Sequence, residues 1–221
     1  MSINAVIPVR AGSRRLPNKN IARFGNSTLL EWKIDQLLKV KEVDQITVSS
    51  DSDLMLEMAS KKGVEIHKRA PEYCDEKTKT FGEVVKHICE SISGEHILWA
   101  TCTAPLVLPE NYSDAIERYF EALQGGFDSL MSVEPFKRYI WTETGPLNYK
   151  LGLDHVPSQE LDQLYFVTDG ILMAPRNKMI EWSYFHGKKP FKYELSKINC
   201  IDIDDEYDLS VSKAWLKDFL E

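Results

Sequence analysis

The sequence has 221 residues, of which 43% are hydrophobic and 28% charged, a composition ordinary for one soluble globular domain. It excludes disorder, collagen and coiled coil as the main character of the chain. No apolar run approaches the roughly 20 residues of a membrane helix, and the net charge of -7 argues against a general nucleic-acid binder. The four cysteines form no CxxC and the five histidines no HxxxH or HExxH, so neither a disulfide framework nor a histidine-based zinc site is expected. The N-terminus has its arginines after a short apolar run, the reverse of a secretory signal, so we expect a cytoplasmic protein.

Apolar segments alternate with amphipathic ones along the chain. Residues 3–9 form a nearly continuous apolar run, typical of a strand buried on both faces. Further strands are predicted over residues 45–50, 64–67, 96–100 and 127–133. Helices are predicted over residues 28–41, 52–62, 80 to about 93, 109 to about 124, and about 206–220. Two of them start with capping boxes, Thr28 with Glu31 and Thr80 with Glu83.

This repeated alternation predicts an α/β fold. A three-layer sandwich is expected, with a mainly parallel sheet and helices on both faces, as a single domain over residues 1–221. Residues 134–163 break the rhythm with proline, aromatic and turn residues, so we interpret them as an excursion from the sheet. The excursion either covers the site as a lid or contacts a second subunit. Its aromatic residues favour a homodimer, since such side chains are common at interfaces: Phe136, Tyr139, Trp141 and Tyr149.

The loop after the first strand, residues 9–20, reads VRAGSRRLPNKN. In open α/β sheets, ligands bind outside the carboxyl ends of the strands. Gly12 permits close backbone approach, and backbone N–H groups with Arg and Lys suit a triphosphate. The loop carries four cations: Arg10, Arg14, Arg15 and Lys19. The alternative is a solvated basic loop. The sequence is not a Walker A motif and has no GxGxxG, which disfavours P-loop NTPases and Rossmann dehydrogenases.

A second constellation is IDIDDEYDL at residues 201–209. On a strand, alternation points Asp202 and Asp204 to the same face. Two neighbouring carboxylates repel each other, and a cation between them relieves that cost. Oxygen ligands suit Mg²⁺ shared with phosphate oxygens. The alternative is that Asp204 or Asp205 caps the final helix and the other carboxylates are surface charges.

Three weaker signals are expected near strand ends: Asp51 with Asp53, the TCTAP stretch at residues 101–105, and Asp169 with Gly170. Each alone is also typical of a helix cap or a turn.

Together these stretches resemble the CMP-N-acylneuraminate synthetases, also called N-acylneuraminate cytidylyltransferases. IPVRAGSRRLPNKN at residues 7–20 resembles the family signature IPARxGSKxxPxKN. WATCTAPLV resembles the strand that ends in a TSPL-like turn, and IDIDDEYDL resembles the IDIDxExDL motif. The resemblance follows chain order, covers nearly the whole chain and is weakest from about residue 134 to 166.

The resemblance implies a nucleotide-diphospho-sugar transferase fold and cytidylyl transfer. CTP and an acidic 2-keto-3-deoxy sugar would give the CMP-sugar and pyrophosphate. Arg10 and Lys19 then act on the CTP phosphates, and Asp202 with Asp204 binds Mg²⁺. The implied further nucleotide-binding residues are Ala11, Gly12, Ser13, Asn20, Arg69 and Thr80. The implied sugar-side residues are Thr101, Thr103 and Asp169.

Two positions depart from the family pattern. Thr101 stands where characterised members carry a Gln near the sugar, and Asp169 precedes Gly170 where they carry Asn-Gly. The sugar therefore stays open among N-acylneuraminate, legionaminate, pseudaminate and rarer acidic sugars. The alternatives are a 3-deoxy-manno-octulosonate or phosphonate cytidylyltransferase, or a nucleotide-binding protein without catalysis.

Overall fold

The structure is a computed structural model that describes residues 1–13, 15–75 and 77–220, the last four by their backbone alone. The strands of its main sheet are β1 (Ile3–Pro8), β4 (Gln45–Ser50), β5 (Glu65–Lys68), β6 (His96–Trp99), β7 (Ser129–Phe136), β10 (Leu164–Pro175) and β11 (Pro190–Glu194). Two small hairpins pair β2 (Arg23–Phe24) with β3 (Ser27–Thr28) and β8 (Trp141–Thr142) with β9 (Gly145–Pro146). The helices are α1 (Leu29–Leu37), α2 (Asp53–Lys61), α3 (Phe81–Ser91), α4 (Pro109–Gln124), α5 (Arg176–Trp182) and α6 (Glu206–Leu220).

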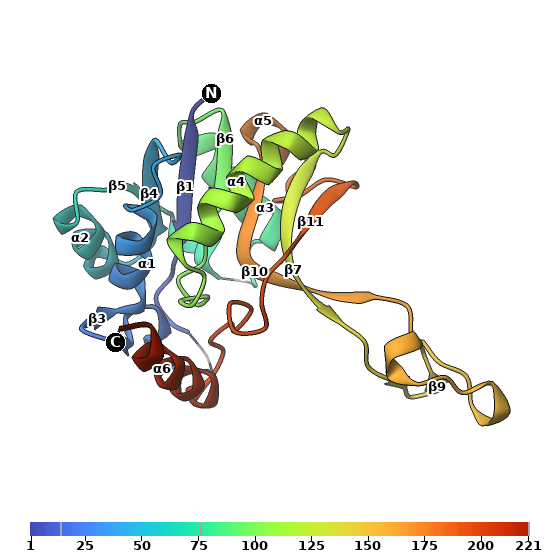
Figure 1. Ribbon diagram of the computed structural model, residues 1–221. Coiled ribbons are helices and arrows are strands. Elements are labelled where there is room, and N and C mark those ends of the chain that lie inside the picture. Colours follow the sequence, from blue (N-terminus) through green and yellow to red (C-terminus); the bar gives the residue numbers. More distant parts are fainter. Residues whose placement is uncertain (14, 76, 221) are drawn as a thin grey trace.

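The main sheet has the strand order β11-β7-β10-β6-β1-β4-β5 (Figure 1). β1, β4, β5 and β6 pair in parallel, and so do β7 and β11. Only β10, among the strands described in this sheet, runs antiparallel to its neighbours, β6 and β7. The predicted α/β class with a mainly parallel sheet is therefore confirmed.

Helices cover both faces of the sheet. The side chains of β1 alternate between the two layers, as the pleat of a strand requires. Ile3, Ala5 and Ile7 lie in a buried cluster with residues of α1, α2 and α4. Val6 lies in a second cluster with residues of α3 and α5. These two clusters are the cores of the three-layer sandwich. Within the described residues, no helix combines the length and the apolar character that crossing a membrane requires.

Both predicted capping boxes are present. The Thr28 hydroxyl accepts from the backbone N–H of Glu31, and the Glu31 carboxylate accepts from that of Thr28. Thr80 and Glu83 make the same reciprocal pair at the start of α3. Each cap satisfies N–H groups that have no partner within the helix, which is worth about 1 kcal/mol. Both caps also fix where the preceding loop ends.

The structure corrects the sequence analysis in two places. β10, α5 and β11 were not predicted, and Asp169 lies inside β10 instead of at a strand end. The pairing of β10 with β7 shifts register between Val167 and Leu172, and we call this irregularity the β10 bulge. Residues 201–204 form no strand, although the Ile203 N–H donates to the Thr103 carbonyl at 2.8 Å. A single backbone hydrogen bond does not make this segment a strand of the sheet. The alternating pattern of residues 201–204 therefore reflects an extended segment in which Ile203 is buried.

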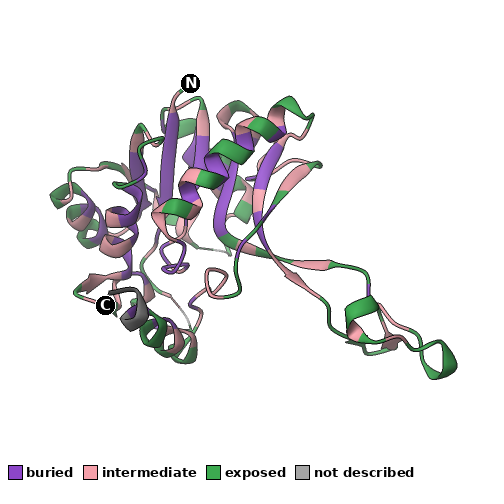
Figure 2. Cartoon of the chain, viewed as in Figure 1, coloured by how far each residue is buried: buried purple, intermediate pink, exposed green. Residues whose placement is uncertain are grey.

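The excursion forms an arm over residues 137–163, because β7 continues to Phe136, which pairs with Leu164 of β10. Figure 1 shows the arm extending away from the sheet, and Figure 2 shows that most of it is exposed. The arm has a small aromatic cluster of its own, in which the ring of Tyr139 lies 4.9 Å from those of Tyr149 and His155. The arm thus has internal contacts and a largely uncovered surface.

Candidate active site

The carboxyl ends of the parallel strands open on a pocket of about 730 Å³. Arg10 follows β1, Arg69 follows β5 and Thr101 follows β6, and all three line this pocket. β10 reaches the same edge because it pairs antiparallel with β6, with Leu172 opposite Trp99. The β10 bulge consequently brings Asp169 into the wall. The site lies where the general rule for open α/β sheets places ligands.

The loop after β1 is held in place by side chains from neighbouring segments. The Asn20 side-chain amide donates to the Arg10 carbonyl at 3.0 Å, and the Cys102 thiol donates to the Asn20 side-chain oxygen at 3.3 Å. The Ala11 N–H donates to the Asp51 carboxylate at 3.0 Å. Gly12 has a φ of 75°, which favours glycine. The Arg10 guanidinium donates to the Cys74 carbonyl at 2.8 Å. Arg14 lies outside the described residues.

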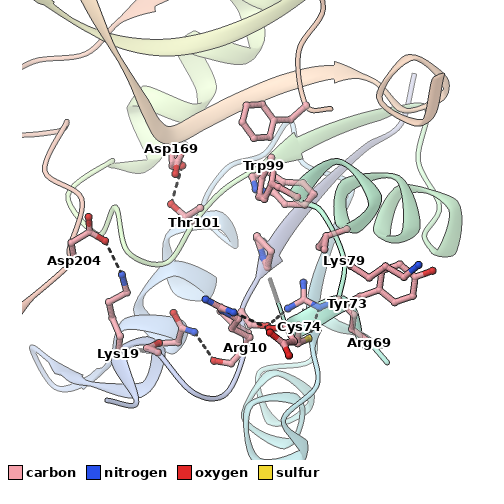
Figure 3. Close-up of a pocket in the computed structure, with 18 of the residues that line it drawn as sticks. Arg10, Lys19, Arg69, Tyr73, Cys74, Lys79, Trp99, Thr101, Asp169 and Asp204 are labelled. Atoms are coloured by element: carbon pink, nitrogen blue, oxygen red, sulfur yellow. Dashed lines mark hydrogen bonds and ion pairs between the residues drawn. The ribbon is translucent and has the colours of Figure 1, made fainter. Parts of the chain in front are cut away.

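Two cations of this loop converge on Asp204. Lys19 Nζ lies 3.2 Å from Asp204 Oδ1, and Arg15 Nη2 lies 2.6 Å from the same oxygen. Figure 3 shows the Lys19–Asp204 pair on one side of the pocket, with Arg69, Tyr73 and Lys79 on the other. The structure thus brings the basic loop and the acidic segment, predicted separately from sequence, to one place.

Asp202 lies beside this pair, and its environment disfavours a lone negative charge. Burial raises the pKa of Asp202, the nearby Asp204 charge raises it further, and a hydrogen bond from Thr103 partly offsets this. Asp202 Oδ1 is buried and has no hydrogen-bond partner. The pKa of Asp169 is raised by burial and then by the charges of Asp202 and Asp204.

These observations fit a bound cation, since an unpartnered carboxylate oxygen beside a second carboxylate is a donor set suited to Mg²⁺. Across the described part of the chain, no group of three or more His, Cys, Asp or Glu residues is arranged to hold a metal. Within the described residues the candidate ligands are therefore Asp202 and Asp204, and so small a protein ligand set is typical of Mg²⁺ that also binds substrate phosphates.

The loop between β5 and α3 forms the opposite wall. Arg69 is 3% exposed, and its guanidinium donates to the Val9 carbonyl at 2.6 Å and to the Cys74 sulfur at 2.9 Å. The Thr80 hydroxyl is committed to the cap of α3, where the Thr80 N–H and Lys79 lower the pKa of Glu83 to about 2. Arg69 therefore joins the loops after β1 and β5, and Thr80 contributes to the wall a hydroxyl that already has partners.

Most of the predicted site residues meet in this pocket. Those that line it are Arg10, Ser13, Lys19, Asn20, Arg69, Thr80, Thr101, Asp169 and Asp204. Ala11, Gly12, Thr103 and Asp202 do not line it. Thr101 donates its hydroxyl to the Asp169 carbonyl at 2.9 Å, which connects the turn at residues 101–105 to the β10 bulge.

The pocket also has an aromatic end that the sequence patterns did not indicate, formed by Phe81, Trp99 and Phe185 with Val84. The ring centroids of Phe81 and Phe185 are 5.4 Å apart in an edge-to-face arrangement. Phe81 directly follows the predicted cap Thr80, and Trp99 lies in the strand predicted over residues 96–100, so both positions were within reach of the sequence. Phe185 follows α5, which was not predicted. Tyr73 and Lys79 also line the pocket and were not singled out.

Comparison with known proteins gives this pocket a context. The chain is 24% identical over 219 residues to N-acylneuraminate cytidylyltransferase A of Danio rerio, which covers 96% of this chain and 50% of that protein. It thus spans about half the length of that relative. It is 23% identical over 220 residues to pseudaminic acid cytidylyltransferase of Campylobacter jejuni, covering 96% of this chain and 95% of that one.

Solved structures of low sequence identity share the fold. CMP:2-keto-3-deoxy-manno-octonic acid synthetase complexed with CTP superposes with a TM-score of 0.72 at 11% identity, covering 99% of each chain. The 4-diphosphocytidyl-2C-methyl-D-erythritol synthase from Anaerococcus prevotii superposes with a TM-score of 0.65 at 15% identity, covering 98% of each chain. The family model described as cytidylyltransferase matches residues 4–199. The chain belongs to the cytidylyltransferase family.

Proposed function

We propose that this chain transfers CMP from CTP to an acidic keto-sugar of the nonulosonic class and releases pyrophosphate, with Mg²⁺ as its metal. The observation that carries the proposal is the meeting of Arg10, Lys19 and Asp204 in one pocket at the carboxyl edge of the sheet. Family membership and the names of the relatives, which act on N-acylneuraminate and pseudaminic acid, support it.

The reaction requires the sugar hydroxyl to attack the α-phosphorus of CTP. A new bond forms between the sugar oxygen and the α-phosphorus while the hydroxyl proton passes to water. The bond from the α-phosphorus to the bridging oxygen breaks, and pyrophosphate leaves with its electron pair. Arg10 and Lys19 supply fixed cationic donors for the phosphates, where charge-assisted hydrogen bonds are strongest. Asn20 holds the Arg10 backbone in place. Bound at Asp202 and Asp204, Mg²⁺ would supply further stabilisation of phosphate charge.

The turn at residues 101–105, the β10 bulge and the aromatic end of the pocket support a particular kind of acceptor. Thr101 and Asp169 offer polar groups, while Phe81, Trp99 and Phe185 offer apolar surface. The acyl groups of an acylated nonulosonic acid present apolar methyl groups that 3-deoxy-manno-octulosonate lacks, so their burial there is favoured. This favours N-acylneuraminate, pseudaminate or legionaminate over 3-deoxy-manno-octulosonate.

We also propose that the protein is a homodimer whose arm contacts the partner. The arm extends away from the main sheet (Figure 1), which supports a partner contact over a lid. Trp141 and Leu147 on the arm are 59% and 64% exposed. Large apolar side chains gathered on a projecting segment are typical of interaction surfaces.

Pyrophosphate release from each nucleoside triphosphate with Mg²⁺ and a panel of sugar acids tests the proposal. We expect release with CTP and a nonulosonic acid only. Calorimetry with CTP, UTP, ATP and GTP gives the binding preference separately. Tighter binding of a purine triphosphate contradicts the nucleotide assignment. Release with 3-deoxy-manno-octulosonate alone moves the acceptor to that class, and CTP binding without release from any acceptor supports the non-catalytic alternative.

A further inference from the structure

Lys33 of α1 is a charged residue with no exposed surface, 0% by accessible area. It lies in the helical layer among the side chains that join α1 and α4. Burying an ammonium group without partners is costly, and a lysine in a core is retained only where it is well bonded. None of the chemistry proposed above uses it.

The Lys33 side chain reaches the turn at residues 101–105. Its Nζ donates to the Ala104 carbonyl at 2.8 Å and to the Tyr112 hydroxyl at 2.7 Å. Two neighbours on α1 reach the next peptide group of the same turn: Trp32 Nε1 and Gln36 Nε2 each donate to the Pro105 carbonyl at 2.9 Å. One face of α1 therefore holds this turn by its carbonyl groups.

The network continues to the β10 bulge. The Tyr112 hydroxyl, which accepts from Lys33, donates to the Gly170 carbonyl at 3.3 Å. A Cβ at Gly170 would lie 2.9 Å from a methyl group of Val107, so the bulge and the segment after the turn are closely apposed. On the pocket side, the Thr101 hydroxyl donates to the Asp169 carbonyl. The turn and the bulge are thus linked twice, once at the pocket wall and once in the core.

We propose that Lys33 is a positioning residue for this active site. Its ammonium group fixes the turn at residues 101–105 to α1 and, through Tyr112, fixes the β10 bulge to α4. Thr101 and Asp169 are thereby held in register at the acceptor side of the pocket. Lys33 acts from behind the wall, since it does not line the pocket itself.

The charge state of Lys33 should then affect the site. Burial lowers the pKa of Lys33 to about 7. The titratable groups that face it are Cys102 from the turn and Tyr112 from α4. Burial raises the pKa of Cys102 to about 12 and raises that of Tyr112 as well. Both neighbours stay neutral while Lys33 titrates, and the charged form makes the stronger hydrogen bonds.

Lys33→Met tests the proposal, because methionine has a similar shape and no donor. This inference rests on the proposed function for its activity readout. We expect kcat to fall about 10- to 100-fold and the KM for the sugar acid to rise, since small misplacements of positioning groups have effects of this size. CTP affinity and stoichiometry by calorimetry should stay within about 3-fold, because the loop that carries Arg10 and Lys19 is bonded to Asp51 and Cys74 as well as to the turn. Lys62→Met is the matched control, since Lys62, at the C-terminus of α2, is a lysine that pairs with Asp35 of α1, the helix that carries Lys33.

Tyr112→Phe is the second variant, and it decides the matter if Lys33→Met does not fold. Like Lys33→Met, it should raise the KM for the sugar acid. In the variant that combines Lys33→Met with Tyr112→Phe, the loss of activity should be smaller than the sum of the two single losses in free energy, since both changes break one network. An unchanged KM in Tyr112→Phe, or a loss in Lys33→Met matched by an equal loss of CTP-binding sites, would overturn the proposal. So would additivity.

Hydrogen exchange gives a readout that does not depend on the reaction. Amides of residues 101–104 and 168–172 should exchange faster in Lys33→Met than in wild type, and at the wild-type rate in Lys62→Met. If the wild type releases no pyrophosphate with any acceptor, the proposed function fails while this measurement still decides the role of Lys33. Unchanged exchange in both segments contradicts that role even in an active enzyme.

Discussion

Lys19 Nζ lies 3.2 Å from Asp204 Oδ1, across a sequence separation of 185 residues. The Lys19 side chain is only 16% exposed, whereas that of Arg15, on the same oxygen, is 68% exposed. Solvent screens the Arg15 contact more strongly. The Lys19 pair therefore contributes more to holding the loop after β1 against the segment that precedes α6, and the candidate site is complete only when both are in place.

Arg10→Ala should cripple turnover and leave the fold intact. Removing one positioned cationic donor for a phosphate typically costs on the order of 100-fold in rate. Pyrophosphate release and circular dichroism on the same sample check the two parts of this expectation. Arg23→Ala is the control, because Arg23 is exposed in the β2–β3 hairpin. A folded Arg10→Ala enzyme within a few-fold of wild type would show that Arg10 has no role in the reaction.

Asp202→Asn combined with Asp204→Asn should abolish Mg²⁺-dependent pyrophosphate release, while some CTP binding through Arg10 and Lys19 remains. The reason is the loss of both carboxylates that can share a cation with the phosphates. The rate of pyrophosphate release is measured as a function of Mg²⁺ concentration, and CTP binding is measured by calorimetry. The two measurements separate the loss of metal from any loss of nucleotide binding. Asp205→Ala is the matched control. The Asp205 carboxylate accepts from the N–H groups of Tyr207 and Asp208 at the start of α6. Its removal should therefore lower the free energy of unfolding by about 1 kcal/mol and leave the Mg²⁺ dependence of the rate unchanged. An unaltered Mg²⁺ dependence in the double variant would place the metal elsewhere.

Light scattering at micromolar concentration should give the mass of a dimer. Trp141→Asp with Leu147→Asp should shift the protein toward monomer, because a charge at a buried contact is costly. Leu54→Asp, which changes an exposed leucine of α2 far from the arm, should leave the dimer intact. A monomeric wild type removes the dimer proposal altogether.

The stability of the wild type relative to Lys33→Met should rise with pH. The pKa of Lys33 is lowered from 10.5 to about 7 in the folded state. Between these values the unfolded chain binds more protons, so the cost of burying the charge is full below pH 7 and is relieved as the pH approaches 10.5. The unfolding free energy of the wild type should therefore rise, relative to that of Lys33→Met, by up to about 1.4 kcal/mol per pH unit in this window. Urea unfolding of both proteins at pH 7, 8 and 9 measures it. A difference that does not change with pH contradicts a titrating Lys33.

Local signals predicted much of this fold. The strand at residues 45–50 and the helix at residues 109–124 match β4 and α4, and the two capping boxes place the starts of α1 and α3. β10 was missed because its bulge inserts Thr168, Asp169 and Gly170 into an otherwise apolar strand, which breaks the period of two. The opposite error occurred at residues 201–204, where alternation was present without a neighbouring strand.

The basic loop and the acidic segment of the site were both visible in sequence, but their meeting was not. Contact between Lys19 and Asp204 depends on the path of the whole chain around the sheet. Lys33 was hidden for another reason: its place in the helical pattern of residues 28–41 gave no sign that its ammonium group is buried against a turn 71 residues away.

Mass spectrometry of the product tests the central claim most directly. Wild-type protein is incubated with CTP, Mg²⁺ and each nonulosonic acid, and the reaction is analysed for a CMP-sugar and pyrophosphate. The account predicts one new species whose mass is that of CMP joined to the sugar acid with loss of water, absent in the Asp202→Asn, Asp204→Asn variant. CTP that remains intact with every acceptor, or a product formed equally by the double variant, would contradict it.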